Sequence, residues 1–275
     1  MNPRYSYPSK VILGLLRDLL LLNRRSFRED SRAIIAQLEP PLQILGEEFV
    51  PSTGPCVLTM NHYTRAGFHI WWAAFAISAV LPSSVHWVMT SEWTTPGKWF
   101  DPFKSAISRF ASERIVQVYD FTSMPPMPPR EKDVASRAAS VRSVLSYADL
   151  NGNNAMIGLA PEGRDESNGK LMRPAPGVGR FCLLLAARHL RFVPVGVYES
   201  KGEFYLNFGE AYELKVCSSQ PTPMKDRLAA EVVMRNISAL LPGELRGEFN
   251  QLESFQNLHE GTRDDGVSES FGRSG

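Results

Sequence analysis

A short polar stretch between two apolar segments carries the histidine that is best placed to do chemistry. Asn61 and His62 open this stretch, which runs to Gly67. The apolar residues before it, 55–60, predict a buried strand, and the uncharged residues after it, 68–81, predict a helix. An imidazole at such a strand-to-helix turn can act as a general base near neutral pH. The residues alone equally allow a histidine whose ring is satisfied by backbone groups of the turn.

A second polar stretch follows another apolar run. Residues 155–159 predict a buried strand that leads directly into Pro161-Glu162-Gly163-Arg164. The glycine permits close approach of the backbone to a ligand, the glutamate can order the loop or bind a hydroxyl group, and the arginine can bind an anion. The alternative is a Glu–Arg pair that only fixes the loop. A third apolar run, residues 192–197, predicts a further strand.

In this order, the three stretches resemble the PlsC-like family of glycerol-phosphate and lysophosphatidic-acid acyltransferases. Asn61-His62 matches the start of the family's Asn-His-x4-Asp motif, residues 161–164 its Pro-Glu-Gly motif and residues 192–197 its Val-Pro-Val strand. The resemblance covers roughly residues 40–215 and implies an α/β fold with a central mixed sheet flanked by helices. It also implies transfer of a fatty acyl group from acyl-CoA or acyl-carrier protein to the hydroxyl group of a lysophospholipid or related lipid, in phospholipid biosynthesis.

The same resemblance assigns roles to single residues. His62 would be the general base that takes the proton of the acceptor hydroxyl, with Glu162 as the second catalytic residue. An amide at Gly163 or the side chain of Arg164 would stabilise the oxyanion. No metal or other cofactor is implied. The positions expected to bind substrate are Asn61, Arg65, Pro161, Gly163 and Arg164.

Three departures from the family pattern bear on the mechanism. Gly67 stands where the motif has the aspartate that orients the histidine. Residues 115–118 predict the strand after which the family has an arginine for the acceptor's phosphate, but Tyr119-Asp120 follows here. Arg164 comes one position early in its motif. Glu92 is the nearest downstream carboxylate that could replace the aspartate. Two rival hypotheses therefore stay open: a catalytically impaired lipid-binding, membrane-peripheral protein of the same fold, and an acyl-thioester hydrolase.

The composition is that of an ordinary globular protein, with 43% hydrophobic and 21% charged residues among 275. A net charge of +1 gives no general attraction to nucleic acid. Three widely spaced cysteines predict neither a disulfide framework nor a zinc site, and favour reduced thiols in a cytoplasmic protein. We expect an amphipathic helical region at 1–40, an α/β domain at 41–250 and a disordered tail at 251–275.

Residues 9–25 predict an amphipathic helix with Ser9 as its N-cap. Lys10, Arg17 and Arg24 recur at seven-residue spacing beside a broad face of leucine, isoleucine and valine. The segment is too short and too charged to cross a bilayer. Two interpretations remain: a helix packed on the core, and a peripheral contact with the inner face of the membrane.

The remaining segments supply the framework. We expect residues 42–46 to form a strand that pairs with the strand at 56–60. Because of Pro194, we expect the strand at 192–197 to lie at a sheet edge or to contain a bulge. The helix at 70–81 is expected to be buried in the core. His86 is expected to be structural. Further strands are predicted at 85–89 and 203–209, and further helices at 30–38, 103–110, 133–150, 178–190 and 224–241.

Overall fold

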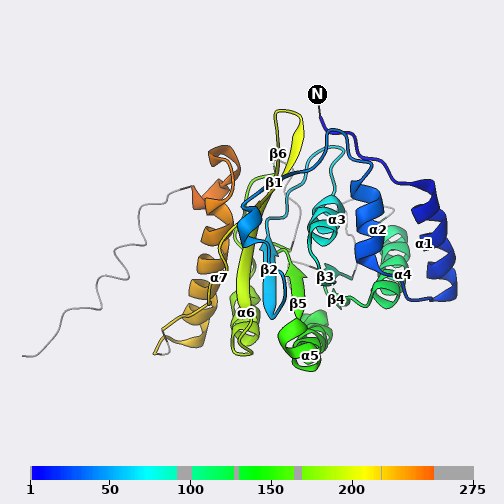
Figure 1. The fold of residues 1–275 in the computed structure, drawn as a ribbon. Helices are drawn as coiled ribbons and strands as arrows, with labels where there is room; N and C mark the ends of the chain where they lie inside the picture. Colours follow the sequence, from blue (N-terminus) through cyan, green and yellow to red (C-terminus); the bar gives the residue numbers. More distant parts are fainter. Residues whose placement is uncertain (1, 92–100, 127–129, 164–168, 218, 251–275) are drawn as a thin grey trace, which may run out of the picture.

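The computed structural model describes residues 2–91, 101–126, 130–163, 169–217 and 219–250. Within them, seven strands form one mixed sheet in the order β1-β7-β6-β2-β5-β3-β4 (Figure 1). This confirms the predicted α/β architecture. The strands are β1 (Gln43–Leu45), β2 (Cys56–Met60), β3 (His86–Thr90), β4 (Thr122–Met124), β5 (Met156–Leu159), β6 (Arg191–Ser200) and β7 (Glu203–Phe208).

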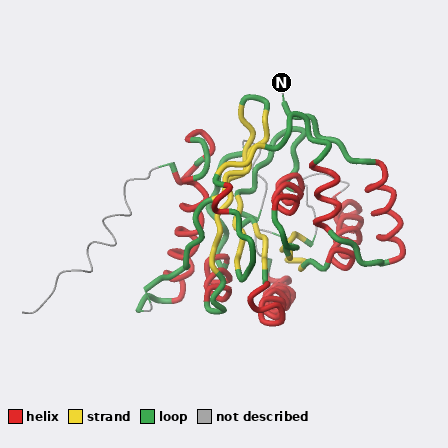
Figure 2. The backbone as a smooth tube through the Cα atoms, in the orientation of Figure 1, coloured by secondary structure: helices red, strands yellow, loops and turns green. Residues whose placement is uncertain are grey.

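Helices cover both faces of the sheet, as the ribbon and tube views show (Figures 1 and 2). Four lie on one face: α1 (Ser9–Leu21), α2 (Phe27–Ile35), α3 (Trp71–Val80) and α4 (Asp101–Tyr119). Three lie on the other: α5 (Val134–Asn151), α6 (Val178–Ala186) and α7 (Thr222–Ala239). Trp72 and Ile77 of α3 are buried, which confirms α3 as a core helix. None of the helices among the described residues is long and apolar enough to cross a membrane.

Strand β2 lies inside the sheet and is buried on both faces. Its Leu58 and Met60 join the apolar cluster under α2 and α3, whereas Val57 joins the cluster under α5, α6 and α7. Burial on both faces explains why the strand reads as a continuous apolar run without alternation. Both neighbours of β2, β5 and β6, run parallel to it, so the carboxyl ends of these three strands meet at one edge of the sheet.

The predicted strand at residues 115–118 is wrong, because these residues lie at the C-terminal end of α4. Their β-branched side chains suit either state, and a short apolar run cannot separate strand from helix by periodicity. The helix continues from Asp101, and Val118 is fully buried in it. The strand that follows is β4, which pairs in parallel with β3.

The predicted pairing of residues 42–46 with 56–60 is also wrong. β1 lies at the sheet edge and pairs in parallel with β7, which follows some 160 residues later in the chain. Pro194 is not at an edge either, since β6 lies between β2 and β7. The Pro194 carbonyl accepts the Gly209 amide at 2.9 Å on the β7 side, ahead of the β6–β7 ladder, which begins at Val195. The missing N–H of the proline therefore costs no bond to β2.

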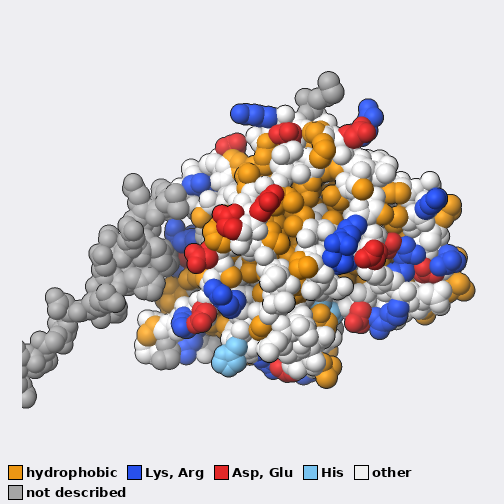
Figure 3. Space-filling model, viewed as in Figure 1, with side chains coloured by type: hydrophobic (Ala, Val, Ile, Leu, Met, Phe, Trp, Pro, Cys, Tyr) orange, Lys and Arg blue, Asp and Glu red, His pale blue; other side chains and the backbone are white. Residues whose placement is uncertain are grey.

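Helix α1 buries an aspartate and leaves much of its apolar surface exposed, together with Lys10 and Arg17. Asp18 is its one buried residue. Pro8 rather than Ser9 occupies the N-cap position, with no side-chain cap. Figure 3 shows hydrophobic side chains beside charged ones at the outer edge of the molecule, where α1 lies. The exposed apolar residues there are Ile12, Leu13, Leu16, Leu20, Leu21 and Leu22.

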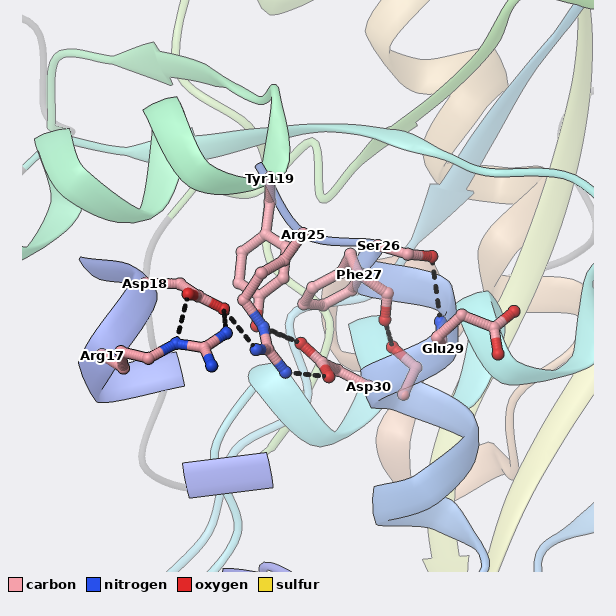
Figure 4. A network of polar contacts seen from close by, with 9 residues as sticks. Arg17, Asp18, Arg25, Ser26, Phe27, Glu29, Asp30 and Tyr119 are labelled. Carbon is pink, nitrogen blue, oxygen red and sulfur yellow. Dashed lines mark hydrogen bonds and ion pairs between the residues drawn. The ribbon is translucent and has the colours of Figure 1, made fainter. Parts of the chain in front are cut away.

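A polar network fastens α1 to its neighbours (Figure 4). Arg25 donates to Asp18 at 2.6 Å and forms a two-pronged pair with Asp30 of α2, at 2.8 and 2.5 Å. The hydroxyl of Tyr119, at the end of α4, donates to Asp30 at 2.7 Å. Hydrogen bonds from Arg17, Arg25 and Asn23 hold the pKa of Asp18 well below its usual range. The attachment of α1 therefore depends on the ionised carboxylate of Asp18.

We expect Asp18→Asn to destabilise the protein at pH 7 and to change its pH dependence. Because the folded-state pKa of Asp18 lies below the unfolded value of about 4, its contribution is complete at neutral pH and is lost as the pH falls below about 4. Urea unfolding at pH 7, 5, 4 and 3 measures this. The gap between wild type and variant should narrow toward pH 3, and a constant gap would contradict the assignment.

Candidate active site

His62 and Glu162 meet at the carboxyl edge of the sheet. The parallel register pairs Thr59 of β2 with Leu159 of β5, so the two residues lie at equivalent positions three residues farther along. The His62 backbone amide donates to Glu162 Oε1 at 2.6 Å. The two motifs that the sequence analysis singled out are therefore neighbours in space, and the contact runs from the histidine's main chain to the glutamate's side chain.

Glu162 ties two loops together. Its Oε2 accepts the backbone amide of Met172 at 2.7 Å, while Oε1 accepts that of His62. Only 2% of Glu162 is exposed. A buried carboxylate that accepts two amide groups fixes the geometry of both segments. The structure thus shows Glu162 holding the His62 turn and the chain after residue 169.

Asn61 is locked to the other neighbouring strand. Its Nδ2 donates to the Val197 carbonyl at 2.8 Å and its Oδ1 accepts the Val197 amide at 2.7 Å. The side chain thereby continues the pairing of β2 with β6 beyond the last strand residue. Asn61 is 1% exposed. Its side chain supports the turn, whereas the family resemblance implies that it binds substrate.

The Arg65 guanidinium is paired with a carboxylate of β6. Its Nε and Nη2 donate to Glu199, and its Nη1 donates to the Ala66 carbonyl. The hydroxyl groups of Tyr5 and Tyr63 donate to the same carboxylate. Hydrogen bonds to Glu199 raise the pKa of Arg65 further above its usual value. The positive charge predicted to contact substrate is thus neutralised within the protein.

Gly67, at the position of the family's aspartate, closes a tight turn. The Phe68 amide donates to the Arg65 carbonyl at 3.0 Å across it. Gly67 has a φ of +84°, and a Cβ there would lie 3.2 Å from Arg65 Nη1. A residue with a side chain would be strained at this φ, so the turn is built for glycine. Glu92, the predicted replacement carboxylate, lies outside the described residues.

The loop after β5 is a turn as well. Gly163 has a φ of +64° and its amide donates to the Ala160 carbonyl at 3.1 Å. This amide, one of the two predicted oxyanion donors, is therefore engaged within the turn. Pro161 and Gly163 line the pocket described next. Arg164, the other predicted donor, lies outside the described residues.

An apolar pocket with a volume of about 150 Å³ opens at the same edge of the sheet. It lies among the ends of β3, β4 and β5, helix α5 and the start of α6. Its lining residues include Met89, Met124, Val141, Leu159 and Phe181. Among the described lining residues, Arg137 alone carries a charged side chain, and burial lowers its pKa. His62 is not one of the lining residues, but Pro161 and Gly163, which flank its partner Glu162, are.

The second buried histidine has a structural setting. His86 Nε2 lies 2.8 Å from Thr122 Oγ1, and its ring stacks on Tyr147 with 4.0 Å between centroids. Burial lowers the pKa of His86, so the ring is neutral at pH 7. These contacts agree with the predicted structural role. No group of three or more histidine, cysteine or acidic side chains within the described ranges is placed to hold a metal ion.

Sequence reasoning missed three residues that surround the His62 turn: Tyr5, Tyr63 and Glu199. Glu199 carried a usable signal, because it lies near the carboxyl end of a strand parallel to β2, where polar side chains of neighbouring strands meet. Tyr5 carried no such signal, because the segment before α1 reaches the His62 turn only through tertiary packing. Its ring packs against Trp72, with 4.7 Å between centroids, and against Phe68, with 5.5 Å.

Two of three comparisons with known proteins found a match. A family model described as Acyltransferase matches residues 41–198, more than half of the chain. No curated protein matches the sequence. Among solved structures, the chain is similar to the crystal structure of the 1-acyl-sn-glycerophosphate (LPA) acyltransferase PlsC from Thermotoga maritima. The likeness has 14% sequence identity and a TM-score of 0.46, and covers 82% of this chain and 87% of that one.

Proposed function

Because the chain belongs to the acyltransferase family, we propose that it transfers a fatty acyl group from acyl-CoA or acyl-carrier protein to the hydroxyl group of a lysophospholipid or related lipid. The observation that carries this proposal is the junction of His62 with Glu162 at the carboxyl ends of β2 and β5. The bond to Glu162 fixes the main chain of His62 at the sheet edge where α/β enzymes bind their ligands. The alternatives are a non-catalytic lipid-binding protein and a thioester hydrolase.

In the proposed reaction His62 acts as general base. It takes the proton of the acceptor hydroxyl as the oxygen attacks the thioester carbonyl carbon. The tetrahedral intermediate then collapses, the carbon–sulfur bond breaks, and the thiolate takes up a proton to leave as the free thiol. The acyl group ends as an ester of the acceptor, and no covalent intermediate on the enzyme is needed. Glu162 and Asn61 hold the turn that carries the base.

The pocket beside Gly163 fits the acyl donor. Methionine, valine, leucine and phenylalanine side chains line it, so it offers an aliphatic chain a desolvated surface. It lies at the same sheet edge as His62, and its lining residues Pro161 and Gly163 flank Glu162, which accepts the His62 amide. Arg137 adds one cationic group to the wall and suits an anionic headgroup or carrier phosphate.

The exposed side of α1 suits the lipid substrate. A helix that buries an aspartate and, with its C-cap residue Leu22, exposes six leucine and isoleucine side chains is not explained by packing on its own domain. Lys10, Arg17 and Arg24 lie exposed at or beside this helix. Apolar residues flanked by cations are typical of helices that lie in the interface of anionic membranes. These features support a peripheral contact of α1 with the membrane surface, which we propose to be on the cytoplasmic side.

We expect Leu20→Ser to weaken binding to vesicles with anionic lipid by about tenfold, because it removes one leucine side chain from the buried contact. Leu20 is 79% exposed. Leu150→Ser is the matched control, since Leu150 is 86% exposed but belongs to α5 on the opposite face. Vesicle co-sedimentation measures both. Equal binding by the two variants would contradict the role of α1.

The function is tested with purified protein, acyl-CoA or acyl-carrier-protein thioesters, and a lysophospholipid extract. The proposal expects free thiol and acylated lipid in equal amounts, and neither from His62→Ala. Thiol release without acylated lipid would favour hydrolysis. Vesicle binding with no thiol release from any donor would favour the lipid-binding protein. Gly67, which replaces the motif's aspartate, is the feature of the sequence that favours this alternative.

A further inference from the structure

Glu199 reaches the His62 turn from β6, on the side of β2 away from Glu162. Its side chain is 7% exposed and accepts a two-pronged ion pair from Arg65. The Tyr63 hydroxyl donates to it at 3.3 Å and the Tyr5 hydroxyl at 2.6 Å. Four hydrogen bonds thus converge on one buried carboxylate, and three of them come from residues of the turn.

Strand β2 lies between β5 and β6, and each neighbour supplies one carboxylate to the turn. Glu162, after β5, accepts the amide of His62 itself. Glu199, of β6, holds the side chains one and three residues farther along. Glu162 therefore holds the turn at the His62 amide, and Glu199 holds it through the side chains of Tyr63 and Arg65.

We propose that Glu199 is a positioning residue for acyl transfer, which fixes His62 through Tyr63 and Arg65. The inference rests on the proposed function and adds to it a residue outside the motifs. It also gives a physical account of an active site with Gly67 in the motif. The turn carries no carboxylate of its own at that position, and a carboxylate from the adjacent strand fixes it from outside.

The contacts of Glu199 with Arg65, Tyr63 and Tyr5 make this group of side chains rigid. Charge-assisted, two-pronged contacts between guanidinium and carboxylate groups are short and directional. Burial and the nearby Glu199 carboxylate raise the pKa of Tyr63, and burial followed by the hydrogen bond to Glu199 raises that of Tyr5. Both hydroxyl groups therefore remain donors at neutral pH. Loss of the carboxylate would leave a half-buried guanidinium and two hydroxyl groups without their shared acceptor.

The test compares Glu199→Gln with Glu231→Gln. Glu231 of α7 is also a nearly buried glutamate, with a side chain 11% exposed and ion pairs to Arg173 and Arg235. We expect Glu199→Gln to lower kcat by about 10- to 100-fold, with the KM of donor and acceptor unchanged within a few-fold. Glu231→Gln should keep the wild-type kcat. Adding Arg65→Gln to Glu199→Gln should recover part of the loss, because no unpaired guanidinium remains.

Amide hydrogen exchange supplies a readout that needs no activity. Exchange at residues 62–66 should rise in Glu199→Gln and stay unchanged in Glu231→Gln. Should Glu199→Gln not fold, Tyr63→Phe removes a single hydroxyl and should lower kcat about threefold. Wild-type kcat and exchange in the folded variants, or an equal loss in Glu231→Gln, would overturn the role of Glu199. A wild-type protein that transfers no acyl group would instead overturn the proposed function. The exchange data would still test whether Glu199 fixes the His62 turn.

Discussion

Replacement of His62 by alanine should lower kcat for acyl transfer by about a thousandfold and leave the KM of both substrates within a few-fold of wild type. The imidazole is the group proposed to take the acceptor's proton, and no other side chain of the described turn can replace it. The contact with Glu162 is made by the His62 main-chain amide, which alanine retains. The variant should therefore fold with the turn intact, and only its catalytic rate should fall. Thiol release under saturating donor and acceptor measures kcat.

His69→Ala is the matched control. His69 lies seven residues farther along, is exposed, and precedes α3. It should keep the wild-type kcat and the wild-type stability to urea. A His62→Ala protein that retained more than about a tenth of the activity would remove His62 as the general base, because a positioned base contributes at least about 100-fold.

The parts of the fold that could be predicted are those with short-range signals. β2 and β5 are buried on both faces and read as apolar runs, and the polar residues after each mark the carboxyl edge. Because parallel neighbours in register bring their ends together, the order of motifs was enough to place His62 beside Glu162. The sequence did not contain the nature of that contact, which is backbone to carboxylate.

The parts that could not be predicted depend on distant residues. β1 takes its partner from β7, and no residue near β1 encodes that choice. Residues 115–118 belong to a helix because α4 continues through them, although their side chains suit a strand equally well. The role of Arg65 was missed for the same reason. A free arginine in a motif suggests a substrate contact, and only the fold reveals that Glu199 neutralises it.

Helix α1 has one feature that could be predicted from the sequence and one that could not. Its amphipathic pattern was visible in the sequence, but the pattern left open which side faces the core. The structure answers this with ion pairs: Arg25 joins the buried Asp18 to Asp30, so the side that carries Asp18 is attached. The exposed apolar residues of the helix are Ile12, Leu13, Leu16, Leu20 and Leu21. The predicted tail at 251–275 lies outside the described residues, and its disorder stays a prediction.

Glu162→Gln should destabilise the protein by about 2–3 kcal/mol and lower kcat at least tenfold, although the side chain keeps its shape. Each oxygen of the Glu162 carboxylate accepts a buried backbone amide, one from His62 and one from Met172. An amide side chain offers one acceptor oxygen and turns an NH₂ group toward the other N–H. One buried donor then loses its partner and faces a second donor, so both loops are loosened at once.

Urea unfolding gives the change in the free energy of unfolding, and thiol release gives kcat. Glu210→Gln, at an exposed position after β7, is the control for the substitution and should change neither quantity. If Glu162 served only to fill space, the glutamine variant would match wild type, since the two side chains have nearly the same volume. Wild-type stability together with wild-type kcat would therefore show that the carboxylate does not hold the His62 turn, and the geometry on which the proposed reaction depends would lose its support.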